Sequence, residues 1–91
     1  MAFVLRFAPN GMNAEKYDEI IRRLDDAGAG SPEGRLYHVC FGDKSNLRVS
    51  DIWDSMENFQ NFGAVLMPIL QEAGVDSGQP EVIEAYNIIE G

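Results

Sequence analysis

The chain has 91 residues, with 15 acidic against 7 basic side chains, a net charge of −8, one cysteine and one histidine. A single cysteine excludes an internal disulfide, and one cysteine with one histidine excludes a zinc site built from four such ligands. The acidic surface would repel nucleic acid and anionic membranes. We therefore expect no metal site, no nucleic-acid partner and no membrane partner.

A chain of this length is expected to form one domain over residues 1–91 with a small core. Such a domain buries only about 60–65% of the surface that it exposes when unfolded, and small domains often gain stability by association. No stretch approaches the roughly 18 apolar residues of a membrane span, and the first residues do not resemble a signal peptide. Together with the lone cysteine, this favours a cytoplasmic homodimer.

The first predicted elements are a strand, a helix and a glycine-rich loop. Residues 2–8 are dense in aromatic and aliphatic side chains, which is typical of a strand. Asn13 is a suitable N-cap for a helix over residues 14–27. The apolar side chains of this helix recur at the spacing of one buried face, and they are Tyr17, Ile20, Ile21 and Leu24. Residues 28–34 then end the helix and form a loop.

The next two predicted strands form a hairpin that brings the only histidine near a carboxylate. These strands cover residues 35–41 and 47–53, and a four-residue loop between them places His38 opposite Asp51. A two-residue loop, Lys44-Ser45, is instead expected to place His38 opposite Trp53. Any even-length loop keeps all three on one face, whereas an odd loop or a bulge destroys the relation. By strand alternation, that face of the first strand carries Leu36, His38 and Cys40.

A second helix and a last strand complete the predicted order. Either Asp54 or Ser55 caps the helix, Pro68 is expected to kink it or divide it into two, and Gly74 is expected to end it. The last strand is predicted from about residue 80 to residue 89. The order β-α-β-β-α-β predicts a ferredoxin-like α+β fold, with a four-stranded antiparallel sheet and both helices on one face.

The predicted strands carry apolar residues on both faces. Those that cannot all face the two helices are Val4, Val39, Ile52, Val82, Ile83, Ile88 and Ile89. A second copy of the chain covering the bare face of the sheet would bury them, which supports the expected homodimer.

Two segments give the sequence a family resemblance. One is the run from Gly34 to His38 after the glycine-rich loop, and the other is Asp51-x-Trp53-x-Ser55, which closes a strand and opens a helix. With the element order of the whole chain, they resemble the dimeric α/β-barrel superfamily and, within it, the antibiotic-biosynthesis-monooxygenase-like domains. The acid of that family's motif is usually glutamate, whereas here it is aspartate.

The resemblance implies a sheet-to-sheet dimer with a pocket in each subunit between sheet and helices. It also implies a cofactor-independent monooxygenase acting on planar, quinol-like aromatics, so no cofactor is expected. In this interpretation His38 is the general base or an orienting donor. One ring nitrogen bonds to its partner Asp51, and the other is free to take a proton from a bound phenol or quinol. Trp53 and Tyr86 would position the ring, and Phe62 and Leu66 would line the cavity.

Structural interpretations compete with each of these roles. A His38–Asp51 pair can hold strand register and nothing more, Trp53 is also a typical core residue, and a half-buried Tyr86 needs no ligand. Two other functions therefore stay open. The chain could be a non-catalytic dimeric module that binds a small ligand or stabilises an assembly, or an isomerase or lyase that uses the same histidine and carboxylate without oxygen.

Overall fold

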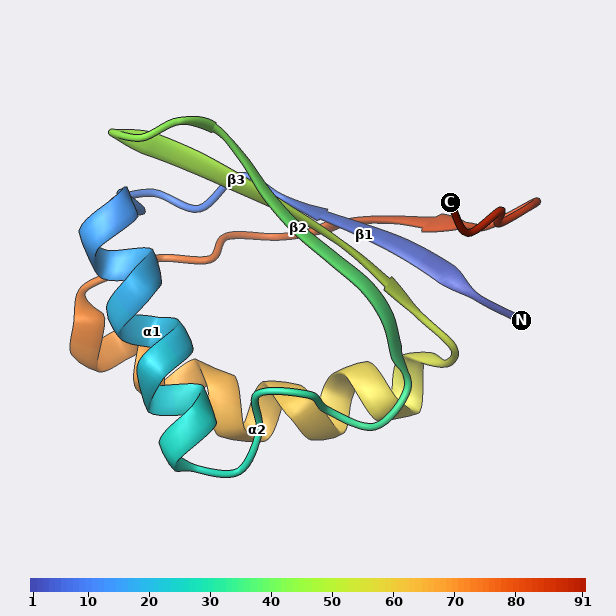
Figure 1. The fold of residues 1–91 in the computed structure, drawn as a ribbon, viewed down its shortest axis with the longest axis horizontal. Coiled ribbons are helices and arrows are strands. Elements are labelled where there is room, and N and C mark those ends of the chain that lie inside the picture. Colours follow the sequence, from blue (N-terminus) through green and yellow to red (C-terminus); the bar gives the residue numbers. More distant parts are fainter.

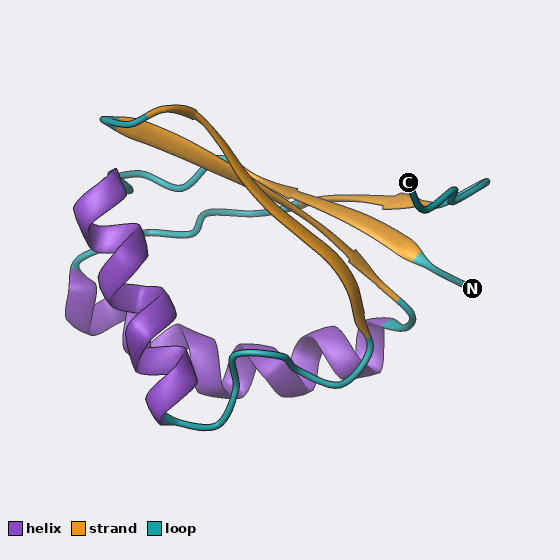
Figure 2. Ribbon diagram, in the orientation of Figure 1, coloured by secondary structure: helices purple, strands orange, loops and turns teal.

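Six elements follow one another in the order β-α-β-β-α-β in the computed structural model, which describes residues 1–91. They are β1 (Phe3–Phe7), α1 (Ala14–Asp26), β2 (Arg35–Asp43), β3 (Asn46–Trp53), α2 (Met56–Ala73) and β4 (Glu81–Glu84). The strands form one antiparallel sheet in the order β2-β3-β1-β4, and both helices lie against the same face of it (Figures 1 and 2). The predicted ferredoxin-like α+β fold is confirmed.

Both helices begin at side-chain caps. The side-chain oxygen of Asn13 accepts a hydrogen bond from the Lys16 N–H at 2.8 Å, as expected for the start of α1. Ser55, the second of the two candidates for α2, accepts from the Asn58 N–H at 3.2 Å. Asp54 stays outside the helix and instead accepts from the Asn58 side-chain amide at 2.9 Å.

The second helix runs as one element through Pro68, so the alternative of two short helices is wrong. Proline removes one backbone hydrogen-bond donor from the helix. Leu70, in the turn after Pro68, is only 4% exposed, and its burial in the core helps to stabilise the end of the helix. The helix ends at Gly74 as predicted. Gly74 has a φ of 73° there, a left-handed conformation that a side chain would strain, and its N–H bonds back to Leu70 and Gln71.

The β2–β3 hairpin has the register that brings His38 opposite Asp51, as predicted. The connecting turn has two residues, Lys44 and Ser45, and Asp43 pairs with Asn46 across it. The expectation that a two-residue loop would place His38 opposite Trp53 is therefore wrong, because this loop and a four-residue loop that pairs Gly42 with Leu47 give the same register. Farther along, a bulge at Leu36 interrupts the ladder, so that Arg35 rather than Leu36 lies opposite Trp53. The placement of Leu36 on the His38 face was therefore wrong, because the extra residue reverses the alternation beyond it.

The last strand is shorter than predicted. β4 ends at Glu84, which already pairs with Phe3, the first residue of β1. After a final backbone hydrogen bond from Ala85 to Ala2, the ladder has no further partner. Tyr86 therefore lies outside the sheet, although the apolar residues that follow it resemble a continued strand.

The two faces of the sheet carry different rows of side chains. On the helix side, one row across the four strands consists of His38, Asp51, Leu5 and Val82. The adjacent row on the open side is apolar throughout and consists of Tyr37, Ile52, Val4 and Ile83.

The core lies between sheet and helices, with Trp53 and Leu5 fully buried. Neither helix has the length and apolarity needed to cross a bilayer.

Candidate functional site

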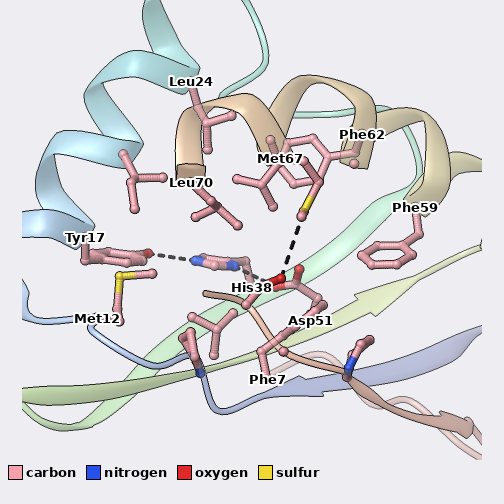
Figure 3. Close-up of a pocket in the computed structure, with 18 of the residues that line it drawn as sticks. Phe7, Met12, Tyr17, Leu24, His38, Asp51, Phe59, Phe62, Met67 and Leu70 are labelled. Carbon is pink, nitrogen blue, oxygen red and sulfur yellow. Dashed lines mark hydrogen bonds and ion pairs between the residues drawn. The ribbon is translucent and has the colours of Figure 1, made fainter. Parts of the chain in front are cut away.

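A cavity of about 280 Å³ lies between the helices and the sheet. Its lining is mostly apolar and comes from both helices, from β1, β2 and β3, and from the connection between α2 and β4 (Figure 3). The polar or charged lining side chains are Tyr17, Arg35, His38, Asp51, Ser77 and Gln79. An apolar pocket with a few convergent polar groups is typical of a small-molecule site.

Four side chains form a continuous hydrogen-bonded chain along one wall of this cavity. The Asp51 carboxylate, 5% exposed, accepts from the Trp53 indole N–H at 3.3 Å with one oxygen. Its other oxygen lies 2.6 Å from His38 Nδ1, and His38 Nε2 lies 2.7 Å from the Tyr17 hydroxyl (Figure 3). The chain Trp53–Asp51–His38–Tyr17 thus links the core to the cavity.

The donors in this chain follow from the chemistry of its members. An ionised carboxylate only accepts, so His38 donates Nδ1–H to Asp51 and keeps a lone pair on Nε2. Tyr17 therefore donates its hydroxyl proton to Nε2. Burial raises the pKa of Tyr17 above its usual value of 10.0, and the nearby Asp51 adds to the rise, so the phenol is protonated at neutral pH.

The expectation that His38 would keep one free nitrogen is therefore wrong in this structure. Nδ1 is bonded to Asp51 as predicted, but Nε2 is occupied by Tyr17, which the sequence analysis treated only as a member of the buried face of α1. Helical spacing placed Tyr17 toward the sheet, but no local pattern relates a position on α1 to one on β2. In the cavity wall, His38 is thus paired with Tyr17 through Nε2.

Arg35 is a second lining residue that sequence reasoning missed. The bulge at Leu36 turns it to the face of His38, and its guanidinium lies 5.8 Å from the ring centroid of Phe62. It donates one hydrogen bond, to the backbone oxygen of Gly30 at 3.0 Å. The site therefore combines a proton-accepting pair with a cation in apolar surroundings.

No protein-family model and no curated protein sequence matches the chain. Solved structures do. SnoaB, a cofactor-independent oxygenase from Streptomyces nogalater, matches with a TM-score of 0.61 and 19% identity over 99% of this chain and 96% of that chain. A provisionally named antibiotic biosynthesis monooxygenase from Chloroflexus aurantiacus J-10-fl matches with a TM-score of 0.61 and 13% identity, over 99% and 97%. Rv0793 from Mycobacterium tuberculosis matches with a TM-score of 0.55 and 11% identity, over 98% and 95%.

The chain has the fold of the antibiotic-biosynthesis-monooxygenase-like proteins. At these identities the likeness establishes architecture, because one fold hosts many chemistries. The resemblance expected from the Asp51-x-Trp53-x-Ser55 segment is thus confirmed at the level of the fold.

Within this monooxygenase-like fold, the predicted ligand-positioning residues separate into two groups. Phe62 and Leu66 line the cavity. Trp53 is 0% exposed and packs against Phe62 with ring centroids 5.4 Å apart, so it supports the wall from behind. Tyr86 is fully exposed, at 105%, and does not line the cavity because β4 ends before it.

No group of three or more His, Cys, Asp or Glu side chains is arranged to hold a metal ion.

The raised pKa of Tyr17 predicts a loss of stability at high pH. The unfolded chain releases the phenolic proton near pH 10.0, whereas the folded chain holds it to higher pH. The folded state therefore binds more protons above about pH 10, and the free energy of unfolding falls there as pH rises. Urea unfolding from about pH 8 to about pH 11 should show a shallower fall for Tyr17→Phe than for the wild type. If the free energy of unfolding falls equally steeply with pH in both proteins, the stabilising role of the protonated Tyr17 is contradicted. The comparison also removes the contribution of Cys40, whose pKa burial raises in both proteins.

Proposed function

We propose that the chain is a small-molecule enzyme of the cofactor-independent monooxygenase type, acting on planar aromatic or quinol-like substrates. The observation that carries this proposal is the Asp51–His38–Tyr17 hydrogen-bonded chain on the wall of an apolar cavity. A buried carboxylate that accepts from one imidazole nitrogen fixes the tautomer and orients the ring, which is the arrangement of a general base. SnoaB, which shares the fold, is a cofactor-independent oxygenase.

In the proposed reaction, Tyr17 relays the proton. The substrate O–H or C–H gives its proton to the Tyr17 oxygen while Tyr17 passes its own proton to His38 Nε2, leaving an imidazolium paired with Asp51. Dioxygen adds to the resulting carbanion or enolate to form a peroxide, and the proton returns along the same path to give a hydroperoxide. Loss of water leaves a carbonyl group on the substrate. The substrate supplies all the electrons, and the protein moves one proton and excludes water.

We also propose that the protein is a cytoplasmic homodimer. The apolar row of Tyr37, Ile52, Val4 and Ile83 lies on the sheet face without helices, and Tyr37 and Ile83 are 56% and 45% exposed. A second sheet packed there would remove these side chains from water. The single cysteine suits a reducing compartment.

Oxygen consumption with a panel of dihydroxynaphthalenes and anthracenones tests the function. The wild type should consume oxygen faster than spontaneous oxidation does, whereas His38→Ala should not, once its fold is verified by melting temperature. Sedimentation of the same preparations should give the mass of a dimer. If wild type and His38→Ala consume oxygen equally with every substrate, the proposal fails. Tyr17→Phe should also be slower than the wild type, and a faster variant would mean that substrate displaces Tyr17 from His38.

A non-catalytic ligand-binding module is the second candidate, and one observation favours it. Every fully buried side-chain nitrogen and oxygen atom has a hydrogen-bond partner within the chain, as expected of a module whose buried polar groups only stabilise the fold. Ligand binding without turnover, under air and under nitrogen, would support this candidate. Turnover that persists under nitrogen would instead indicate an isomerase or lyase that uses the same residues.

A further inference from the structure

Arg35 is placed in the cavity by a local irregularity of the sheet. Regular alternation would put it on the open face with Tyr37, but the bulge at Leu36 brings it opposite Trp53 on the helix side. Bulges are enriched beside active sites, where they redirect a side chain. Here the redirected side chain is the only arginine or lysine that lines the cavity.

The charge of Arg35 has no partner within the chain, which carries more than twice as many acidic as basic side chains. Arg6, Arg22 and Arg23 each form salt bridges with carboxylates, whereas Arg35 forms none. The other basic residues without a salt bridge, Lys16, Lys44 and Arg48, do not line the cavity. The guanidinium of Arg35 makes one hydrogen bond, to Gly30, so most of its five N–H donors have no hydrogen-bond partner within the chain. The carboxylate in the same lining, Asp51, is engaged by His38 and Trp53.

We propose that Arg35 binds a carboxylate carried by a planar aromatic ligand whose ring occupies the apolar part of the cavity. The fork of an arginine matches the two oxygens of a carboxylate, and Phe62 beneath the guanidinium provides an apolar wall for the ring. The net charge of −8 disfavours anions elsewhere on the molecule. Arg35, Tyr17 and His38 all line this one cavity. A ligand anchored at Arg35 therefore lies within reach of the Tyr17–His38 pair.

Arg35 lines the same cavity as the Tyr17–His38 pair, so this inference rests on the proposed function. Within that function, the carboxylate site would select the substrate. It is tested with an unreactive pair of probes, 2-naphthoate and 2-naphthamide, which differ in charge and have nearly the same shape. In calorimetric titrations at fixed ionic strength, the wild type should bind 2-naphthoate about 10- to 100-fold more tightly than 2-naphthamide. Arg35→Gln should lose that preference and still bind 2-naphthamide as the wild type does.

Arg48→Gln is the matched control, since Arg48 is an exposed arginine of β3 that lies over Phe41 and does not line the cavity. It should retain the preference for 2-naphthoate. Arg35→Lys should keep part of it, because the charge remains and the fork is lost. In the wild type alone, added salt should weaken 2-naphthoate binding and leave 2-naphthamide binding unchanged, a result that needs no variant to fold.

The inference is overturned if the wild type binds the two probes equally or binds neither, or if Arg35→Gln keeps the preference. Neither probe is oxidised, so these outcomes are independent of catalysis. A protein that prefers 2-naphthoate but consumes no oxygen with any quinol retains the carboxylate site and loses the proposed function. A protein that oxidises quinols but shows no preference for 2-naphthoate retains the proposed function and loses the carboxylate site.

Discussion

Replacing Asp51 by asparagine should reduce turnover of any substrate by a factor of about 10² to 10⁴ while leaving the fold intact. The amide has nearly the shape of the carboxylate but can present only one acceptor. The Trp53 indole N–H points at one of the two oxygens, so the amide oxygen should turn to Trp53 and the NH₂ group to His38 Nδ1. His38 must then accept at Nδ1 and carry its proton on Nε2, which removes the lone pair that receives the proton from Tyr17.

The tautomer itself is measurable without a substrate. His38 is the only histidine, so its imidazole ¹⁵N resonances need no assignment by mutagenesis. The wild type should show a protonated Nδ1 and Asp51→Asn a protonated Nε2, with the free energy of unfolding changed by about 1 kcal/mol or less because both hydrogen bonds are replaced. Asp54→Asn is the control, because Asp54 is exposed and its side chain bonds only to Asn58. Unchanged turnover or an unchanged tautomer in Asp51→Asn would contradict the role given to Asp51.

Replacing Trp53 by alanine should bring the protein close to unfolding. Trp53 is 0% exposed and lies between Phe59 and Phe62, with ring centroids 5.7 and 5.4 Å away. Truncating a buried large aromatic costs about 3–5 kcal/mol, against a total stability of about 5–14 kcal/mol for a domain of this size. The melting temperature should fall by at least about 12 °C, measured by circular dichroism because the change removes the only tryptophan.

Two further variants separate the contributions of Trp53. Trp53→Phe keeps most of the buried ring and loses the hydrogen bond to Asp51, so it should be less damaging than Trp53→Ala. Tyr86→Ala removes an aromatic that is fully exposed, and it should change the free energy of unfolding by no more than about 0.5 kcal/mol. A loss below about 1 kcal/mol in Trp53→Ala would mean that the core does not depend on this residue.

Alternation along the strands was enough to predict that the central pair of the site shares one face of the sheet. In the hairpin, an even-length connection keeps His38 and Asp51 on one face, and the observed register places them opposite each other. The caps of both helices and the stop at Gly74 were also predictable, because each depends on a side chain or a backbone conformation within a few residues.

The parts that could not be predicted depend on contacts between distant segments. The bond between Tyr17 and His38 requires α1 to cross the sheet at the position of β2, which no local pattern specifies. The bulge that redirects Arg35 has no clear signature in the surrounding sequence. β4 ends early because β1 offers it no further partner, although its own sequence favours a longer strand.

The bond between Trp53 and Asp51 also gives the unlabelled protein an internal optical reporter. The only indole is shielded from water, and its N–H contacts the carboxylate that supports the His38–Tyr17 pair. Indole emission depends on solvent access and on charge near the ring. A red shift on exposure to water would therefore report loss of the fold, whereas a change of intensity at constant wavelength would report a change in the state of Asp51. If the cavity binds a ligand as proposed, tryptophan emission of the unlabelled chain should therefore respond to that binding.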